Sequence, residues 1–127
     1  MEGLQKELEY IVTNNDTAKT VGSGTLELLA TPRLVALVEN VAMSLVQENL
    51  EDGKTTVGTK VDVSHIVATP VGMKINIVAK VVKVDGRRIV FDVSAYDEKE
   101  KILEGIHERC IITVEKFVER VYSYINR

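Results

Sequence analysis

The apolar residues between Pro32 and Leu50 recur every three or four positions, which is the spacing of one face of an α-helix. Thr31 is placed to cap the amino end of this helix, with Pro32 in its first turn. The segment ending at Gly53 is placed to terminate it. The apolar positions cover well over half of the helical wheel, so we expect the helix to be buried on most sides. They are Leu34, Val35, Leu37, Val38, Val41, Ala42, Leu45, Val46 and Leu50.

Outside this helix the hydrophobic pattern alternates with a period of two, which predicts β-strands. A modest strand is expected from Leu4 to Thr13, followed by a loop over 14–24. Long strands are expected after Gly53, with a two-residue hairpin turn at Gly86 and a closing amphipathic helix in the tail from Glu115. The expected inner faces are Val57, Thr59, Val61, Val63, His65 and Val67; Met73, Ile75, Ile77, Ala79 and Val81; Ile89, Phe91, Val93 and Ala95; and a last strand over Ile102–Val114.

This order of elements predicts an α+β fold in a single domain over residues 1–127. Consecutive long strands joined by short turns form an antiparallel sheet. The sheet must curl around the long apolar helix, because nothing else in the sequence is available to bury it. One curled sheet around one helix is the hot-dog arrangement.

Composition narrows the class of function. The sequence has 127 residues, 45% of them hydrophobic and 28% charged, as in ordinary globular proteins. A net charge of −3 and the absence of Trp argue against a nucleic-acid partner. No apolar run is long enough to span a bilayer, so we expect no membrane partner. Charges at the start of the chain argue against a signal peptide, and the lone Cys110 fits a reducing compartment, so a cytoplasmic location is expected.

Three residues are candidates for chemistry. Glu39 falls on the apolar side of the predicted helix, where a carboxylate costs free energy unless it is paired; alternatively, it sits at the edge of that face and reaches solvent or a lysine. His65 lies on the inner face of a Val-rich strand, either as a catalytic group or as a core histidine bonded to a backbone carbonyl. Thr31 places a hydroxyl at the positive end of the helix, although a capping residue needs no other role.

A second group of candidates lies on the strands. His107 and Arg109 share a strand face and are placed to meet an anionic ligand, or else to form a solvated or salt-bridged surface. His107 and Cys110 point to opposite faces, so they are not a metal pair, and two histidines and one cysteine are too few for a structural zinc site. Gly58, inside a strand, marks either a bulge or a close approach of a ligand.

The sequence resembles the fluoroacetyl-CoA thioesterase-like family of hot-dog proteins. The resemblance rests on segments 31–39, 57–72, 84–89, 93–97 and 105–117, and especially on the H-x-x-A-T-P motif from His65 and the G-x-H-E-R motif ending at Arg109. It implies a catalytic set of Thr31, Glu39 and His65, with Gly58 and Arg109 contacting the substrate. One departure concerns residues 14–30, which contain no Phe, Tyr or Trp where fluoroacetyl-specific members have an aromatic lid.

These residues predict hydrolysis of a small acyl-CoA to free acid and CoA, without a metal or redox cofactor. Glu39 would attack the thioester carbonyl or deprotonate the attacking water, and His65 would help to protonate the leaving thiolate. We also expect an obligate homodimer with the site at the dimer interface; a tetramer formed from two such dimers is the alternative assembly. A hot-dog hydratase or dehydratase and a non-catalytic acyl-CoA-binding module are the alternatives.

Overall fold

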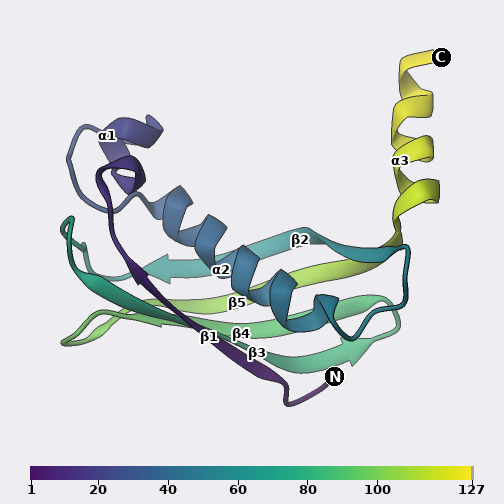
Figure 1. Cartoon of the computed structure of the whole chain (residues 1–127), viewed down its shortest axis with the longest axis horizontal. Helices are drawn as coiled ribbons and strands as arrows, with labels where there is room; N and C mark the ends of the chain where they lie inside the picture. Colours follow the sequence, from purple (N-terminus) through teal and green to yellow (C-terminus); the bar gives the residue numbers. More distant parts are fainter. Residues whose placement is uncertain (127) are drawn as a thin grey trace.

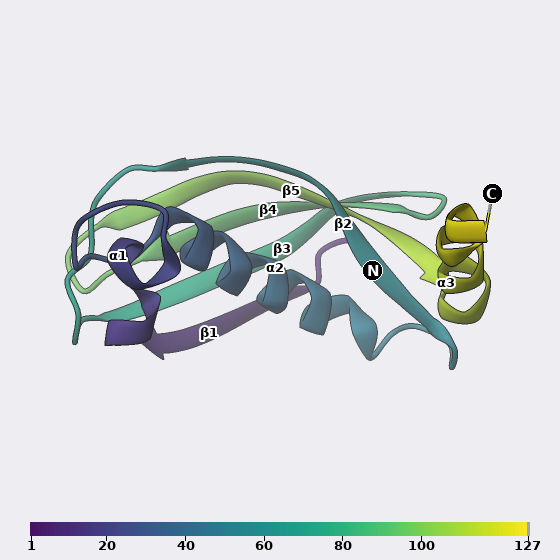
Figure 2. The same ribbon diagram turned by 90° about the horizontal axis from the view of Figure 1, so that it is seen from above.

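The computed structural model describes residues 1–126 as one antiparallel sheet curled around one long helix (Figures 1 and 2). The sheet has five strands in the spatial order β1-β3-β4-β5-β2. The hot-dog arrangement expected from the sequence is therefore confirmed. The strands are β1 (Gln5–Ile11), β2 (Lys54–His65), β3 (Lys74–Asp85), β4 (Arg88–Tyr96) and β5 (Lys101–Thr113); the helices of more than one turn are α2 (Thr31–Gln47) and α3 (Val114–Tyr122).

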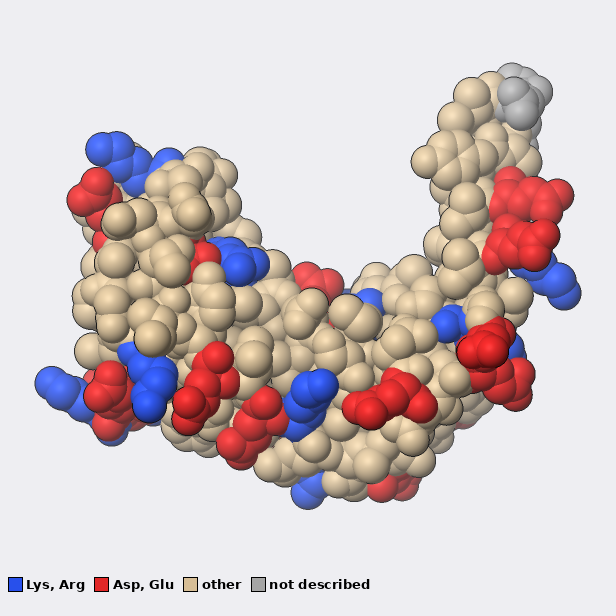
Figure 3. All heavy atoms as spheres, viewed as in Figure 1, with Lys and Arg blue, Asp and Glu red and all other residues tan. Residues whose placement is uncertain are grey.

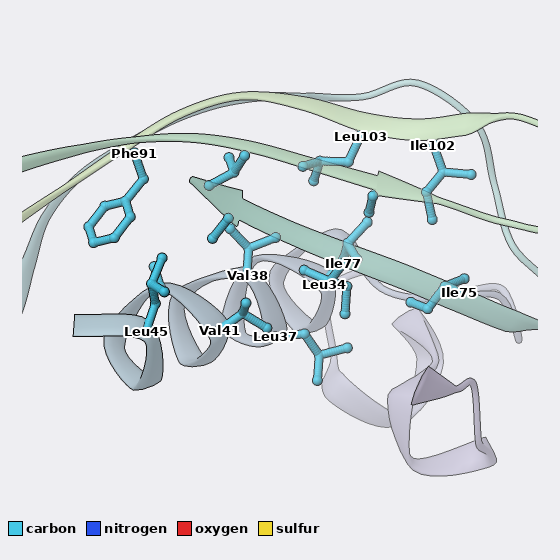
Figure 4. Close-up of a cluster of buried hydrophobic side chains, with 14 of the residues drawn as sticks. Leu34, Leu37, Val38, Val41, Leu45, Ile75, Ile77, Phe91, Ile102 and Leu103 are labelled. Carbon is cyan, nitrogen blue, oxygen red and sulfur yellow. The ribbon is translucent and has the colours of Figure 1, made fainter. Parts of the chain in front are cut away.

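The core lies between α2 and the concave face of the sheet (Figure 4). Apolar side chains of α2 point toward residues of β3, β4 and β5, and most of them are completely buried. The central contacts join Leu34, Val38, Val41 and Leu45 of the helix to Ile75, Ile77, Phe91, Ile102 and Leu103 of the sheet.

Both ends of α2 differ from the sequence-based expectation. The amino-terminal cap is Ala30, which makes no side-chain capping bond, and Thr31 is already inside the helix. The Thr31 hydroxyl is bonded to His65 instead, so it is not available to cap. At the other end the helix stops at Gln47 rather than Leu50, because the backbone after it tightens into turns whose N–H groups bond three residues back.

A β-bulge in β2 corrects the predicted inner face of that strand. The pairing of β2 with β5 shifts between Gly58 and Lys60, so that one extra residue, Thr59, is inserted. Up to the bulge, Thr56 and Gly58 face the helix and Val57 faces away, the reverse of the expectation. After the bulge the expected face is correct.

Residues 13–30 form a structured cover, which we call the lid segment, in place of the expected loop over 14–24. It contains the 3₁₀ turn η1 (Asn14–Asp16) and the one-turn helix α1 (Ala18–Val21), at the amino end of α2 in Figure 1. Asp16 is almost fully buried and accepts bonds from the Arg33 side chain at 2.7 Å and the Tyr10 hydroxyl at 2.8 Å. These contacts tie the lid segment to α2 and β1.

The carboxy-terminal helix α3 does not close over the sheet as expected. It rises from the end of β5 and stands away from the body of the protein (Figure 1). None of its residues is buried, and its apolar side is exposed in this single chain. Figure 3 shows a broad concavity between the lid segment and α3, and most of the surface facing the viewer there is uncharged.

Candidate active site

Thr31 and His65 form the first part of the site. The Thr31 hydroxyl, at the start of α2, lies 2.7 Å from Nδ1 of His65, the last residue of β2. Nε2 of His65 is buried and has no hydrogen-bond partner among the described residues. Burial lowers the pKa of His65 below its usual 6.5, and the nearby backbone of Val67 only partly opposes this. The imidazole is therefore neutral at neutral pH, with one nitrogen free for a bound molecule.

Glu39 and Arg109 form the second part. Arg109, from β5, is 7% exposed, and its Nη1 lies 4.0 Å from Oε2 of Glu39. The guanidinium is held in place because it donates from Nε to the Thr56 hydroxyl at 2.7 Å and from Nη2 to the Thr56 carbonyl at 3.0 Å. Burial lowers the pKa of Arg109 and Glu39 opposes this, but a guanidinium stays charged in proteins. A fixed positive charge thus stands beside the carboxylate.

His107 helps to hold the Arg109 guanidinium in place. It is completely buried and stacks on Phe91, with ring centroids 5.9 Å apart. Its Nδ1 lies 2.7 Å from the Lys60 carbonyl, which can only accept, so Nδ1 carries the proton. Nε2 then accepts from Nη1 of Arg109 at 3.2 Å. His107 is therefore a positioning residue and does not meet an anion directly.

Gly58 is required by the space around Glu39. A Cβ atom at this position would lie 2.9 Å from Oε2 of Glu39 and 3.3 Å from Nη1 of Arg109. Any side chain here would displace one of the two charged groups. Of the two sequence-based alternatives for Gly58, the bulge is present directly after it, and the groups that approach it closely are side chains of this chain.

The single chain does not bring the predicted catalytic set together. Thr31 and Glu39 are eight residues apart on α2, which corresponds to about 12 Å along the helix axis. They line different hollows. The one beside Thr31 and His65 has a volume of about 360 Å³, and the one beside Glu39 and Arg109 about 270 Å³. The single chain thus presents two separate clusters of candidate residues, which we call the half-sites.

Glu39 itself is not a buried charge in the single chain. Its side chain is 39% exposed, so of the two readings of the sequence the edge position is the correct one. Its partner is Arg109 and not a lysine. The ion pair between the buried Asp16 of the lid segment and Arg33 of α2 was not predicted, although Thr13 and Asp16 have the spacing of a capping box, which the structure contains. Among the described residues, no cluster of His, Cys, Asp and Glu is arranged to hold a metal ion, and no helix is long and apolar enough to cross a membrane.

Comparison with known proteins matches this chain to one family. Residues 12–115 match the profile of the fluoroacetyl-CoA-specific thioesterase family. The chain is 38% identical over 95 residues to the fluoroacetyl-CoA thioesterase of Streptantibioticus cattleyicolor, covering 75% of this chain and 68% of that protein. The crystal structure of a fluoroacetyl-CoA thioesterase superposes with a TM-score of 0.92 at 30% identity, covering 97% of this chain and 96% of the other.

The same fold is found in a protein of lower sequence identity. A hot-dog-like protein from Thermanaerovibrio acidaminovorans superposes with a TM-score of 0.90 at 22% identity, covering 97% of this chain and 91% of the other. The resemblance inferred from the motifs is confirmed, as are the hot-dog fold and the expected class of activity, a thioester hydrolase. The chain belongs to the fluoroacetyl-CoA-specific thioesterase family.

Proposed function

We propose that the chain hydrolyses the thioester of an acyl-CoA at sites shared between two protomers of a homodimer. The observation that carries this proposal is the separation of the two half-sites on α2. Thr31 and His65 are hydrogen-bonded to each other, whereas Glu39 lies about 12 Å away along the helix beside Arg109. A twofold axis would unite Glu39 of one protomer with Thr31 and His65 of the partner subunit.

The edge of the sheet supports this assembly. β2 is an edge strand, so the backbone groups along its outer side have no partner strand in the single chain. Val61 and Ile66 are large apolar residues exposed on or just after this strand. If β2 pairs with its own copy in antiparallel fashion about an axis between Val61 and Asp62, Gly58 lies opposite His65 of the partner subunit. That pairing would bring the two half-sites face to face.

Each residue has a role in the proposed reaction. Glu39 either attacks the thioester carbonyl carbon or takes a proton from the attacking water, and the fixed charge of Arg109 keeps the carboxylate in place. The carbonyl carbon gains a C–O bond, to water or to the Glu39 carboxylate, as the C–S bond breaks, and CoA leaves as its thiolate. Where Glu39 is the nucleophile, water then hydrolyses the acyl–carboxylate anhydride, which releases the free acid and regenerates Glu39. His65, oriented by Thr31, is neutral, so it first accepts the proton that the attacking water releases and then donates that proton to the leaving thiolate. The backbone N–H of Gly58 is the candidate donor to the oxygen that gains negative charge.

The proposal is tested by release of free thiol from a panel of acyl-CoA substrates, followed with a thiol reagent. We expect thiol release that requires both halves of the site. Hydration of a double bond without thiol release would instead indicate the hydratase reading, and binding with neither reaction would indicate a binding module. Sedimentation at micromolar concentration tests the assembly, and a monomer that is fully active would refute the shared site.

We also propose a cytoplasmic location and a single hot-dog domain over residues 1–127. The free thiol of Cys110 is the observation that favours a reducing compartment. Fractionation of cells that produce the protein, followed by immunodetection, tests the location.

A further inference from the structure

The hollow beside Thr31 and His65 is walled mainly by hydrocarbon. It lies between the lid segment and the residues that follow β2, and its volume is about 360 Å³. Thr31 and His65 are among the residues that line it, so a hydrocarbon chain bound in the hollow would start beside these two polar side chains. The apolar wall is formed by Ala18, Leu26, Leu28, Leu29, Val67 and Ala68.

The lid segment keeps this hollow open. Short antiparallel bridges join Thr17 to Leu29 and Leu28 to Pro70, and the Leu29 N–H donates to the Thr69 carbonyl at 2.9 Å. The ion pair between the buried Asp16 and Arg33 holds the other end of the segment against α2. Because both ends are fixed by hydrogen bonds, the hollow is part of the folded structure and not a gap that a ligand must create.

The hollow is also much larger than a two-carbon acyl group needs. A closed apolar cavity of roughly 150 Å³ binds benzene, and this hollow has more than twice that volume. No aromatic side chain is among the residues that line it in the described part of the chain, so nothing fills the space above Thr31 and His65. Small apolar residues such as Ala18 and Ala68 leave room for hydrocarbon instead.

We propose that this hollow binds the acyl group of the substrate, and that the preferred acyl group is an unbranched or lightly branched hydrocarbon chain of about six to ten carbons. This inference rests on the proposed thioesterase function and specifies its substrate class. Each methylene that enters the hollow leaves water, which favours binding about three- to fourfold. A fluoroacetyl group is too short to use this surface.

The decisive experiment measures kcat/KM by thiol release for a series of saturated acyl-CoA substrates from two to twelve carbons. We expect kcat/KM to rise about three- to fourfold per methylene from four carbons upward and to level off between about six and ten carbons. A series that is flat, or that peaks at acetyl-CoA or fluoroacetyl-CoA, would overturn the inference.

Two variants test whether the dependence of kcat/KM on acyl-chain length arises in the hollow. Ala68 is exposed at its wall, so Ala68→Phe fills the space without forcing atoms into the core. This variant should lower the ratio of kcat/KM for the eight-carbon substrate to kcat/KM for acetyl-CoA at least tenfold. Val71→Phe adds the same ring at an exposed position outside the lining and serves as the control. Equal chain-length profiles for the two variants would overturn the inference.

Binding measurements test this inference independently of the proposed function. Thioether analogues of the acyl-CoA series cannot be hydrolysed, and their dissociation constants are measured by calorimetry on the unmodified protein. Affinity that rises with chain length and is lost in Ala68→Phe supports the hollow even if no substrate is hydrolysed, an outcome that would refute the proposed function alone. Affinity that does not depend on chain length refutes the inference even if hydrolysis is observed.

Discussion

Replacement of Glu39 by Gln separates catalysis from stability in this protein. The change keeps the size of the side chain and removes its charge and its basicity. If Glu39 is the general base, its loss lowers kcat by about 10²–10⁴, equivalent to roughly 3–5 kcal/mol, and loss of a nucleophile costs more. The expected loss of activity is therefore large.

The expected change in stability is small, and its size follows from the contacts of the carboxylate. Glu39 is 39% exposed and 4.0 Å from Arg109, so the pair resembles a surface ion pair worth less than about 1 kcal/mol. Arg109 keeps its bonds to Thr56 and His107 after the change. A buried, unpaired carboxylate on the apolar side of the helix would cost free energy, but in the single chain this charge is not buried.

The assay pairs thiol-release kinetics with thermal unfolding of the same preparations. Glu48→Gln, an exposed glutamate at the carboxy-terminal end of the same helix, is the matched control and should retain both activity and stability. Glu39→Gln should unfold within a few degrees of the unchanged protein and still bind acyl-CoA. A kcat near that of the unchanged protein would refute the carboxylate mechanism.

Three further predictions concern neighbouring groups. Gly58→Ala places a Cβ 2.9 Å from Oε2 of Glu39, so kcat should fall at least tenfold while unfolding shows a well-folded protein; an active alanine variant would mean that the carboxylate has no fixed position. Because the pKa of His65 is held below 6.5 by burial, activity that needs the neutral ring should persist down to pH 6.5 and decline only in more acidic solution; pH–rate profiles that fall already above pH 6.5 would contradict this. The pKa of Asp16 is lowered to about 2, since burial, which would raise it, is outweighed by bonds from Arg33, Thr13 and Tyr10. Its ionised form therefore contributes about 2 kcal/mol above pH 4, a contribution lost as the pH falls toward 2, and Asp16→Asn should remove that part of the pH dependence in urea unfolding.

The sequence was most informative where one periodicity ran without interruption. The body of α2 and the alternation of β3 and β4 depend only on which residues are apolar, so the helix, the sheet and the hot-dog arrangement were predicted correctly. Gly58 offered a bulge as one alternative, but the reversed inner face before it was not predicted, because the residues on both sides of Thr59 fit a regular alternation. The effect of the bulge is visible only in the pairing with β5.

The sequence identified candidate residues of the site but not how they are arranged in space. Glu39, His65 and Thr31 were selected because each is unusual in its local pattern, but the pattern contains no information on which of them meet. The bond between Thr31 and His65 joins residues 34 positions apart, and it displaced the predicted capping role. The exposed apolar side of α3 was likewise expected to be covered by its own sheet, because periodicity predicts an apolar face without predicting what covers it.

Because β2 contains one extra residue, the number of residues in the strand decides which of its side chains face the helix. Deletion of Thr59 would restore regular pairing with β5 and rotate every residue on the amino-terminal side of the gap to the opposite face of the sheet. Val57 would then point at the helix, and Thr56, whose hydroxyl and carbonyl both accept from Arg109, would point away from it. A single-codon deletion at an exposed position would thus disconnect the guanidinium from its support while leaving every residue of the site in the sequence.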